Sequence, residues 1–446
     1  MARTTHRSSI LLFLLGLGCM TKVYFLGTIA ISELIIFFVA PVLFFKNYSR
    51  MRYEGFLSYI YMLSALILGL LISAAWNDSP YTFTLKQFAI FYGFFAYYVV
   101  FYCLLRGNFK GIGWFFFGAF ISGIITIWVL NPSAAVSSTG FAYISNAEAE
   151  DVIHGPLFWI GKVRGLCELP IFAAYLKTPI VYSVFAPVLF VVFAMFSSIS
   201  GRAQSMCVLL GGAMILVARK SRVRMKRIGR HLILMAVIGV VVLLAYKAAY
   251  AYTASRGYLG EDARIKYEHQ TDRGKGVFAM LVAGRTEFFI ALTAIIDHPL
   301  IGFGPRAEDT HGYTERFLLD YGTEADIRGY YYYAYQYASQ GLRASIPSHS
   351  HIMGAWLACG ISGLIFFLWI FYQFYLHFRF YISAIPQWYG YFVITIPSIA
   401  WGILFNPVTD RYVLPLLMVC IFYSKAVSLG KIVLPYELEL EATKGE

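Results

Sequence analysis

The chain has 446 residues, of which 59% are hydrophobic and 13% are charged, and its mean hydropathy is +0.64. Soluble domains carry about 25% charged residues, so this composition excludes an ordinary water-soluble fold. The formal net charge of +12 suggests nucleic acid at first sight, but it fits a membrane protein better, because Lys and Arg accumulate in cytoplasmic loops and fix the orientation of the helices.

Long apolar runs follow one another along the chain, separated by short polar joints. Each is about 15 to 25 residues long, which is the length that a helix needs to cross a bilayer. In chain order the runs cover residues 9–23, 25–45, 56–76, 86–105, 111–130, 180–199, 203–218, 232–253, 350–375, 388–405 and 412–428. No cleavage signal accompanies the first run, so we expect it to remain as a span. The sequence therefore predicts an all-α integral membrane protein.

The charges between the runs set the number of crossings. Arg3 and Arg7 place the N-terminus inside, and the seven cationic residues within 219–230 must also lie inside. Eleven crossings would put that cluster outside. A further short crossing over 165–176 repairs the conflict, and such a span is tolerated where protein covers it. The predicted fold therefore has about twelve transmembrane helices with both ends in the cytoplasm.

This topology divides the chain into three parts of one membrane domain. Residues 1–253 hold the first nine transmembrane helices, and residues 350–446 hold the last three and a cytoplasmic tail. Between them, residues 254–349 have a soluble-like composition. We expect this segment to lie on the outer side of the membrane and to contain amphipathic helices.

The outer segment, residues 254–349, contains residues suited to binding an anion. Gly284-Arg285 precedes an amphipathic stretch over 288–297, and the loop 299–306 contains Gly302, Gly304 and Arg306 together with two prolines. Such a loop has two interpretations. Its backbone amides face an anion, or the loop is simply a turn between an interfacial helix and the next segment. The sequence leaves both interpretations open, and the turn is preferred for the loop taken alone.

Two further elements lie on the same predicted face of the membrane. His349 and His351 begin the run at 350–375, and an imidazole with a pKa near 6.5 is suited to accept a proton from a sugar hydroxyl. Arg202 follows an apolar run without an obvious acidic partner nearby, so it either snorkels to the surface or faces a cavity.

The order of these motifs resembles that of the O-antigen ligase and O-antigen polymerase superfamily, whose members are bacterial inner-membrane glycosyltransferases of the GT-C type. The resemblance covers roughly residues 165–428. It rests on Ser-Gly-Arg at 200–202, Gly-Arg at 284–285, Pro-Leu-Ile-Gly-Phe-Gly at 299–304, and His349 eleven residues before the glycine that opens Gly-Ile-Ser-Gly at 360–363.

The resemblance implies an inverting, metal-independent transfer of a glycan from undecaprenyl diphosphate to a sugar hydroxyl on the periplasmic face. His349 would act as general base or orient the acceptor, although the nearby His351 is an alternative. Arg202 and Arg285 would clamp the diphosphate leaving group, as guanidinium groups do in a bidentate way. Arg306 would be a weaker third cation, and Gly302, Gly304 and His351 would contact substrate.

The expected partners are the lipid-linked donor, membrane lipids, and either lipid A core or a growing polysaccharide as acceptor. The first acceptor would make the protein a ligase and the second a polymerase. No cofactor and no nucleic acid are expected. A lipid-linked oligosaccharide flippase or other transporter is the alternative from a different class, although no inverted repeat is found in the sequence.

Several residues have competing interpretations. A metal site built from Asp309, His311 and the two histidines near 350 lacks ligand spacing, and no pair of the six cysteines has CxxC spacing. Tyrosines at 330–337 either stack on sugars or, preferably, form an interfacial aromatic belt. Glu33 lies within an apolar run, where an acid either has a functional role or, equally well, pairs with Lys22 or makes another polar contact inside the bundle.

Two charged loops have simpler interpretations. Asp410-Arg411 is most simply a local ion pair, although it would also suit the border of a substrate cavity. The basic loop 219–231 fixes topology and is suited to contact anionic lipids.

Overall fold

The structure is a computed structural model, and it describes ten segments of the chain, together with Ile396 and isolated residues between 241 and 267. The segments are 2–20, 22–24, 28–106, 111–125, 286–321, 324–339, 343–348, 350–377, 399–404 and 411–432. They are mostly helical, as predicted for an all-α protein. The predicted spans at 165–176, 180–199 and 203–218 lie outside the described residues, as do most of 232–253 and 388–405.

The chain begins with helix α1, Ala2–Met20, followed by an antiparallel hairpin of strands β1, Lys22–Tyr24, and β2, Thr28–Ala30. This hairpin was not predicted, and it corrects the start of the apolar run expected at 25–45. Val23 pairs with Ile29 across the hairpin. Because β-branched and aromatic residues fit a pleated ladder, this part of the apolar run forms strands and the helix starts later.

Helix α1 packs against α5, Ile112–Ile125, through glycines on both helices. A Cβ atom added to Gly16 would collide with the carbonyl oxygen of Phe115, and one added to Gly118 would collide with that of Phe13. Small residues at a crossing let two backbones approach closely, which is a common way for helices to associate in a membrane.

Among the described residues, three helices are long and apolar enough to cross a membrane. They are α2, Ile31–Glu54, α3, Leu57–Trp76, and α4, Tyr81–Leu105. Shorter apolar helices cover His6–Cys19, Ile361–Leu376 and Val413–Ser428. The predicted spans at 56–76 and 86–105 therefore form helices, the second starting five residues earlier than expected.

These helices carry large apolar side chains on their outer surfaces. Phe38, Val42 and Phe45 of α2 and Trp76 and Tyr81 at the α3–α4 turn are all mostly exposed. Soluble proteins rarely expose such a concentration of apolar surface, whereas a lipid-facing helix requires it.

The run predicted at 350–375 is two helices instead of one. Helix α17, His351–Cys359, ends at Gly360, and α18, Ile361–Leu376, starts directly after it. Gly360 has a φ angle of +62°, which breaks the helical path. The last described helix is α20, Val413–Ser428, close to the predicted 412–428.

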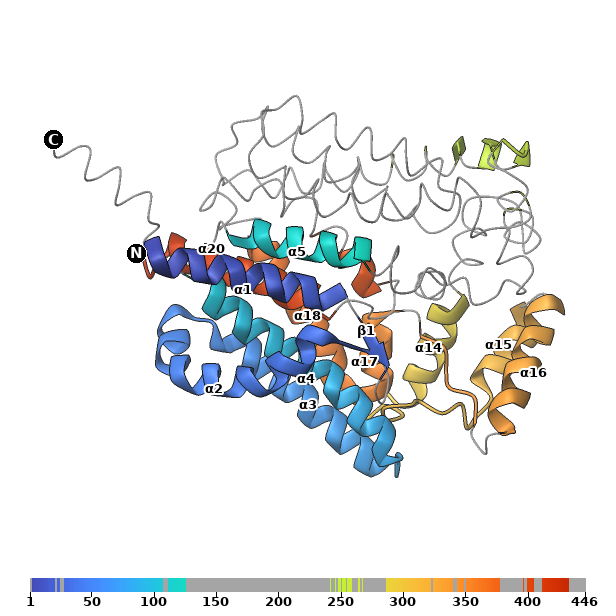
Figure 1. Cartoon of the computed structure of the whole chain (residues 1–446). Coiled ribbons are helices and arrows are strands. Elements are labelled where there is room, and N and C mark those ends of the chain that lie inside the picture. The colour runs from blue at the N-terminus through green and yellow to red at the C-terminus, as the bar shows by residue number, and fades with distance from the viewer. Residues whose placement is uncertain are drawn as a thin grey trace.

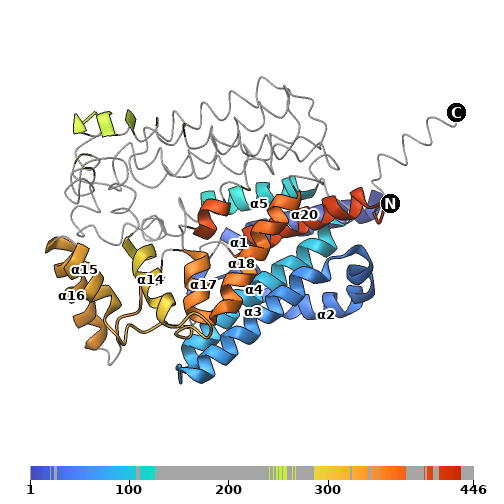
Figure 2. The same ribbon diagram turned by 180° about the vertical axis from the view of Figure 1, so that it is seen from behind.

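The segment predicted to lie in the periplasm forms three helices in its described part. They are α14, Thr286–Asp297, α15, Tyr313–Tyr321, and α16, Glu324–Ala338. Helix α14 packs against α17 and α15, and α15 packs against α16. The three gather beside α17 at one end of the coloured part of the molecule (Figure 1), as the view from behind also shows (Figure 2).

Aromatic side chains fill the centre of the bundle between α3, α4, α18 and α20. Tyr59 lies 4.3 Å from Tyr98 between ring centroids, and Phe56 lies 5.9 Å from Phe422. Trp369 of α18 stacks near Phe422 at 6.2 Å. These contacts hold the N-terminal helices against the C-terminal ones, which are separated by some three hundred residues.

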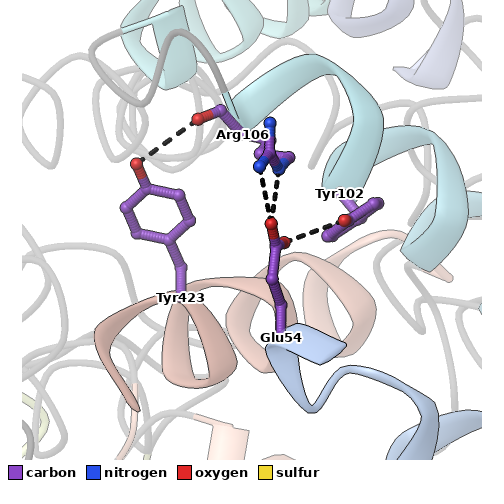
Figure 3. Close-up of polar contacts among 4 residues, drawn as sticks. All are labelled: Glu54, Tyr102, Arg106 and Tyr423. Atoms are coloured by element: carbon purple, nitrogen blue, oxygen red, sulfur yellow. Dashed lines mark hydrogen bonds and ion pairs between the residues drawn. The ribbon is translucent and has the colours of Figure 1, made fainter. Parts of the chain in front are cut away.

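The C-terminal ends of α2, α4 and α20 meet at what we call the basic end. Its cationic residues are Lys46, Arg50, Arg52, Arg106, Lys425 and Lys431. Arg106 contacts the buried carboxylate of Glu54 through Nε at 2.8 Å and Nη2 at 2.6 Å (Figure 3). Tyr102 donates to the other carboxylate oxygen at 2.8 Å. Tyr423 donates to the backbone carbonyl of Arg106 at 3.4 Å.

Candidate functional site

The two glycine motifs of the sequence meet in space and form what we call the glycine junction, residues 300–304 against 357–363. Gly302 has a φ angle of +77°, and a Cβ atom there would lie 2.5 Å from the Leu357 carbonyl oxygen and 2.8 Å from the Gly360 nitrogen. A Cβ atom on Gly360 would collide with the carbonyl of Leu300. Both positions therefore require glycine, for space and for backbone conformation.

Hydrogen bonds across the junction satisfy the backbone groups that the helix break leaves free. Phe303 N donates to Leu357 O at 2.7 Å, and Ile361 N donates to Leu300 O at 2.9 Å. The indole of Trp356 donates to Pro299 O at 2.7 Å. Non-helical backbone is tolerated at membrane depth only when protein satisfies it in this way.

The turn between α3 and α4 closes the junction from another side. The Asn77 amide donates to Gly302 O at 3.2 Å and to Ser73 O at 2.8 Å. Gly304 faces Ser79, and a Cβ atom added to Gly304 would collide with Ser79 Oγ. No signal in the sequence linked this turn to residues more than two hundred positions later.

This geometry bears on the predicted role of the loop amides. Gly302 N donates to His298 O at 3.1 Å, and Phe303 N is committed to Leu357. Two amides of the loop therefore serve the chain itself, which favours the turn interpretation over an anion cradle. The substrate-binding role of Gly302 and Gly304 stays a prediction.

Arg306 is held by several groups of the chain. Its guanidinium contacts Glu308 at 3.0 Å and donates to the backbone carbonyl of Arg343 at 2.6 Å. It also lies over the ring of Phe83 at 4.8 Å and that of Tyr337 at 5.6 Å. The side chain is only 8% exposed, so in this conformation it joins the loop to α4 and α16. Its contact with a diphosphate stays a prediction.

Ser350 anchors the start of α17. It is buried, and its hydroxyl accepts from Met353 N at 3.3 Å and donates to Ile403 O at 3.0 Å. Ser is a favoured N-cap because its oxygen satisfies a free amide of the first turn. His351 follows in that turn, half-buried, with its ring 6.1 Å from that of Phe367.

The three residues expected to do the chemistry, His349, Arg285 and Arg202, lie outside the described residues. The chain nevertheless places their neighbours. Arg285 directly precedes α14, and His349 directly precedes Ser350 at the start of α17. The base and the clamp stay predictions.

The alternative metal site loses one of its ligands in the part of the chain that the structure describes. Both carboxylate oxygens of Asp309 accept backbone amides, from Tyr313 at 2.7 Å and Thr314 at 2.8 Å. Asp309 thus caps α15. Within the described segments, no three His, Cys, Asp or Glu side chains come together as metal ligands.

The tyrosines of α16 are partly exposed. Tyr331, Tyr332 and Tyr335 face outward, and the hydroxyl of Tyr331 donates to Glu315 at 2.6 Å. This bond and some desolvation raise the pKa of Tyr331. The contacts favour neither sugar stacking nor an interfacial belt, so both stay predictions.

An ion pair between distant parts of the chain was not foreseen in this form. Arg411 Nη1 contacts the buried Glu33 carboxylate at 2.9 Å, and Ala30 N donates to the same oxygen at 3.1 Å. The expectation of a polar contact inside the bundle is thus confirmed for Glu33. Arg411 therefore pairs across the bundle, whereas Asp410 lies outside the described residues and the local pair expected for Asp410-Arg411 stays a prediction.

Comparison with known proteins adds no relative. No protein-family model matches the sequence, and no curated protein matches it significantly. The likeness to the O-antigen ligase and polymerase superfamily therefore rests on the motifs alone.

Proposed function

We propose that the protein is an integral membrane protein of the bacterial inner membrane with about twelve transmembrane helices. Three long apolar helices and their exposed apolar side chains support this architecture. The basic end is cationic, whereas residues 286–348, which pack at the opposite end of α3 and α4, contain eight acidic and four basic residues. This contrast fits a cytoplasmic basic end and a periplasmic glycine junction.

The proposed activity is transfer of a glycan from undecaprenyl diphosphate to a sugar hydroxyl, inverting and without metal, as in an O-antigen ligase. The observation that carries the proposal is the glycine junction itself. Two motifs that define the resemblance lie 58 positions apart in the sequence, at Gly302 and Gly360, yet they pack backbone to backbone.

The arrangement of α14 and α17 supports a joint role for the residues that precede them. The two helices pack together, and their C-terminal ends are joined by the bond from Trp356 to Pro299. Because α14 and α17 lie side by side with their C-terminal ends adjacent, the two helices run in the same direction. The chain therefore enters both helices from the same side, directly after Arg285 and directly after His349. A general base and a diphosphate clamp must lie close together, and we propose this for His349 and Arg285.

A flippase for the same lipid-linked glycan is the second candidate. The break between α17 and α18 at Gly360 favours it, because transporters use interrupted helices near their substrate sites. A polymerase of the same superfamily differs from a ligase only in its acceptor.

The test is a reconstituted assay with purified full-length protein and undecaprenyl-diphosphate-linked glycan. Lipid A core and lipid-linked repeat unit are supplied as separate acceptors, and the new glycosidic product is measured. We expect product with one acceptor, and a loss of at least about a hundredfold in His349→Ala, the typical contribution of a general base. Arg285→Ala should be similarly impaired.

The matched control for Arg285→Ala is Arg328→Ala, an exposed arginine on α16, which should retain activity. All variants are compared at equal folded amount. Movement of the glycan across the bilayer that persists in His349→Ala, without product from either acceptor, would establish the flippase and exclude the transferase. Product from lipid A core alone identifies a ligase, and product from repeat unit alone identifies a polymerase.

A further inference from the structure

Four aromatic rings close into a cycle next to the glycine junction. His298 lies 4.8 Å from Phe303 between centroids, Phe303 lies 5.8 Å from Tyr313, Tyr313 lies 5.6 Å from His311, and His311 lies 5.9 Å from His298. The members come from the residue after α14, the glycine loop, the loop before α15 and the first turn of α15. We call this group the four-ring cluster.

Hydrogen bonds fix the polar groups of the cluster. The Tyr313 hydroxyl donates to Asp297 Oδ2 at 2.6 Å, and burial together with this bond raises the pKa of Tyr313, so the hydroxyl remains protonated. The Thr310 hydroxyl lies 2.9 Å from His311 Nδ1 and orients that imidazole.

Several polar atoms of the cluster remain available for a ligand. Asp297, His298 and His311 are exposed. Among the described residues, Asp297 Oδ1, His311 Nε2 and the ring nitrogens of His298 make no hydrogen bond. An exposed carboxylate and two exposed imidazoles therefore border the partly buried ring of Phe303, and together they offer flat ring surface and directed polar contacts of the kind that orient a small polar ligand.

The cluster is tied to the glycine junction, at the ends of α14 and α17 opposite to those that Arg285 and His349 precede. Phe303 stands between the two glycines of the junction loop, and the backbone carbonyl of His298 accepts the Gly302 amide. The positions of Phe303 and His298 are therefore set by the same backbone contacts that hold α17. A ligand on the cluster would lie beside the C-terminal ends of α14 and α17.

We propose that the four-ring cluster with Asp297 is a binding subsite for the acceptor glycan, where it contacts a sugar remote from the reacting hydroxyl. The subsite rests on the proposed glycosyl transfer and names where the acceptor is recognised. Sugar hydroxyls donate to the Asp297 carboxylate and bond to the imidazoles, while the sugar C–H face packs against a ring. The carboxylate disfavours the anionic diphosphate of the donor. Among the described residues, Asp297, His298 and His311 do not come together as a set of three metal ligands.

Binding and turnover are measured separately to test the subsite. Delipidated lipid A core oligosaccharide and soluble repeat-unit oligosaccharide are titrated against the full-length protein in nanodiscs without donor. In Asp297→Asn and His311→Phe, the oligosaccharide should bind about tenfold or more weakly, because the first substitution replaces a charged acceptor with a neutral amide and the second removes both ring nitrogens. His311→Phe retains an aromatic ring in the cluster, so a weaker affinity reports the lost nitrogens rather than lost packing.

Turnover gives the second readout. The KM for acceptor should rise in both variants while the KM for the lipid-linked donor stays unchanged. Asp320→Asn, which alters an exposed carboxylate on α15, is the matched control and should behave as the unmodified protein. Unchanged affinity and acceptor KM in the variants would overturn the subsite, as would failure of both oligosaccharides to bind the unmodified protein. Variant-sensitive binding without any glycosyl transfer would instead overturn the proposed function and leave a glycan-binding site.

Discussion

At the basic end, side chains hold the helices together, whereas at the glycine junction the backbone does so. Glu54, Tyr102 and Arg106 form an ionic network between α2 and α4, and Tyr423 of α20 reaches its edge (Figure 3). At the junction, the carbonyl and amide groups of Leu300, Phe303, Leu357 and Ile361 bond directly to one another.

The difference shows which part of the molecule tolerates change. A side-chain network leaves room for substitution, because neighbouring groups and water replace part of each lost contact. A backbone junction between glycines leaves no room for even one added carbon. The glycine junction therefore has a fixed geometry, which suits the proposed transferase because its reacting groups must be aligned.

The largest expected effect is that of Gly360→Val at the junction. The φ angle of +62° is unfavourable for a β-branched residue, and the new side chain would collide with the carbonyl of Leu300. We expect a loss of roughly 2–4 kcal/mol, combining backbone strain with overpacking. Thermal unfolding of the purified protein in detergent measures the loss as a lowered Tm.

The matched control is Gly329→Ala on α16. A Cβ atom there meets nothing within 4 Å, so the substitution should be neutral or stabilise the helix by about 0.5–1 kcal/mol. If Gly360→Val unfolds at the same temperature as the unmodified protein, the two motifs do not form a tight junction.

The sequence predicted individual helices of the bundle but not the backbone contacts of the glycine junction. The apolar runs predicted α3 and α20 to within one residue at each end, because run length alone sets a membrane helix. The break at Gly360 was not visible in the sequence, because the apolar run continues through it and the interrupting loop lies 58 residues earlier.

The site itself was predicted only as a set of motifs. Their order indicated that residues 299–304 and 360–363 belong to one functional unit, but not that they touch. The pair Glu33–Arg411 was inaccessible for the same reason: its members are 378 residues apart, and no local pattern links them. Asp297 and Tyr313 carry no motif, and only the packing of α14 against α15 brings them together.

At the basic end, Arg106→Ala should have an intermediate effect. It leaves the buried carboxylate of Glu54 with Tyr102 as its remaining partner in the network, and an uncompensated buried charge is costly. Because the Arg106 side chain is 35% exposed, water replaces part of the loss, and we expect on the order of 2 kcal/mol.

A double variant separates the cost of the unpaired Glu54 charge from the cost of the lost contact with Arg106. Glu54→Gln added to Arg106→Ala removes the unpaired charge and should recover part of the lost Tm. Arg52→Ala, an exposed arginine of the same end, should leave the Tm unchanged. A double variant less stable than Arg106→Ala alone would mean that the carboxylate has another strong partner.

The smallest effect should be that of Tyr423→Phe, which tests how far the side-chain network extends. Its hydroxyl reaches the Arg106 carbonyl at 3.4 Å, a distance at which a hydrogen bond is weak, so we expect a loss below about 0.5 kcal/mol.

The comparison for Tyr423→Phe is Tyr102→Phe. It removes a 2.8 Å bond to a buried carboxylate and should cost about 1.5–3 kcal/mol, the range for hydrogen bonds to charged groups. Equal losses for the two tyrosines, measured by thermal unfolding side by side, would mean that α20 is as firmly bound to the network as α4. A clear difference would instead place the ionic contact between α2 and α4, with α20 held mainly by the aromatic packing of Phe422 on Phe56.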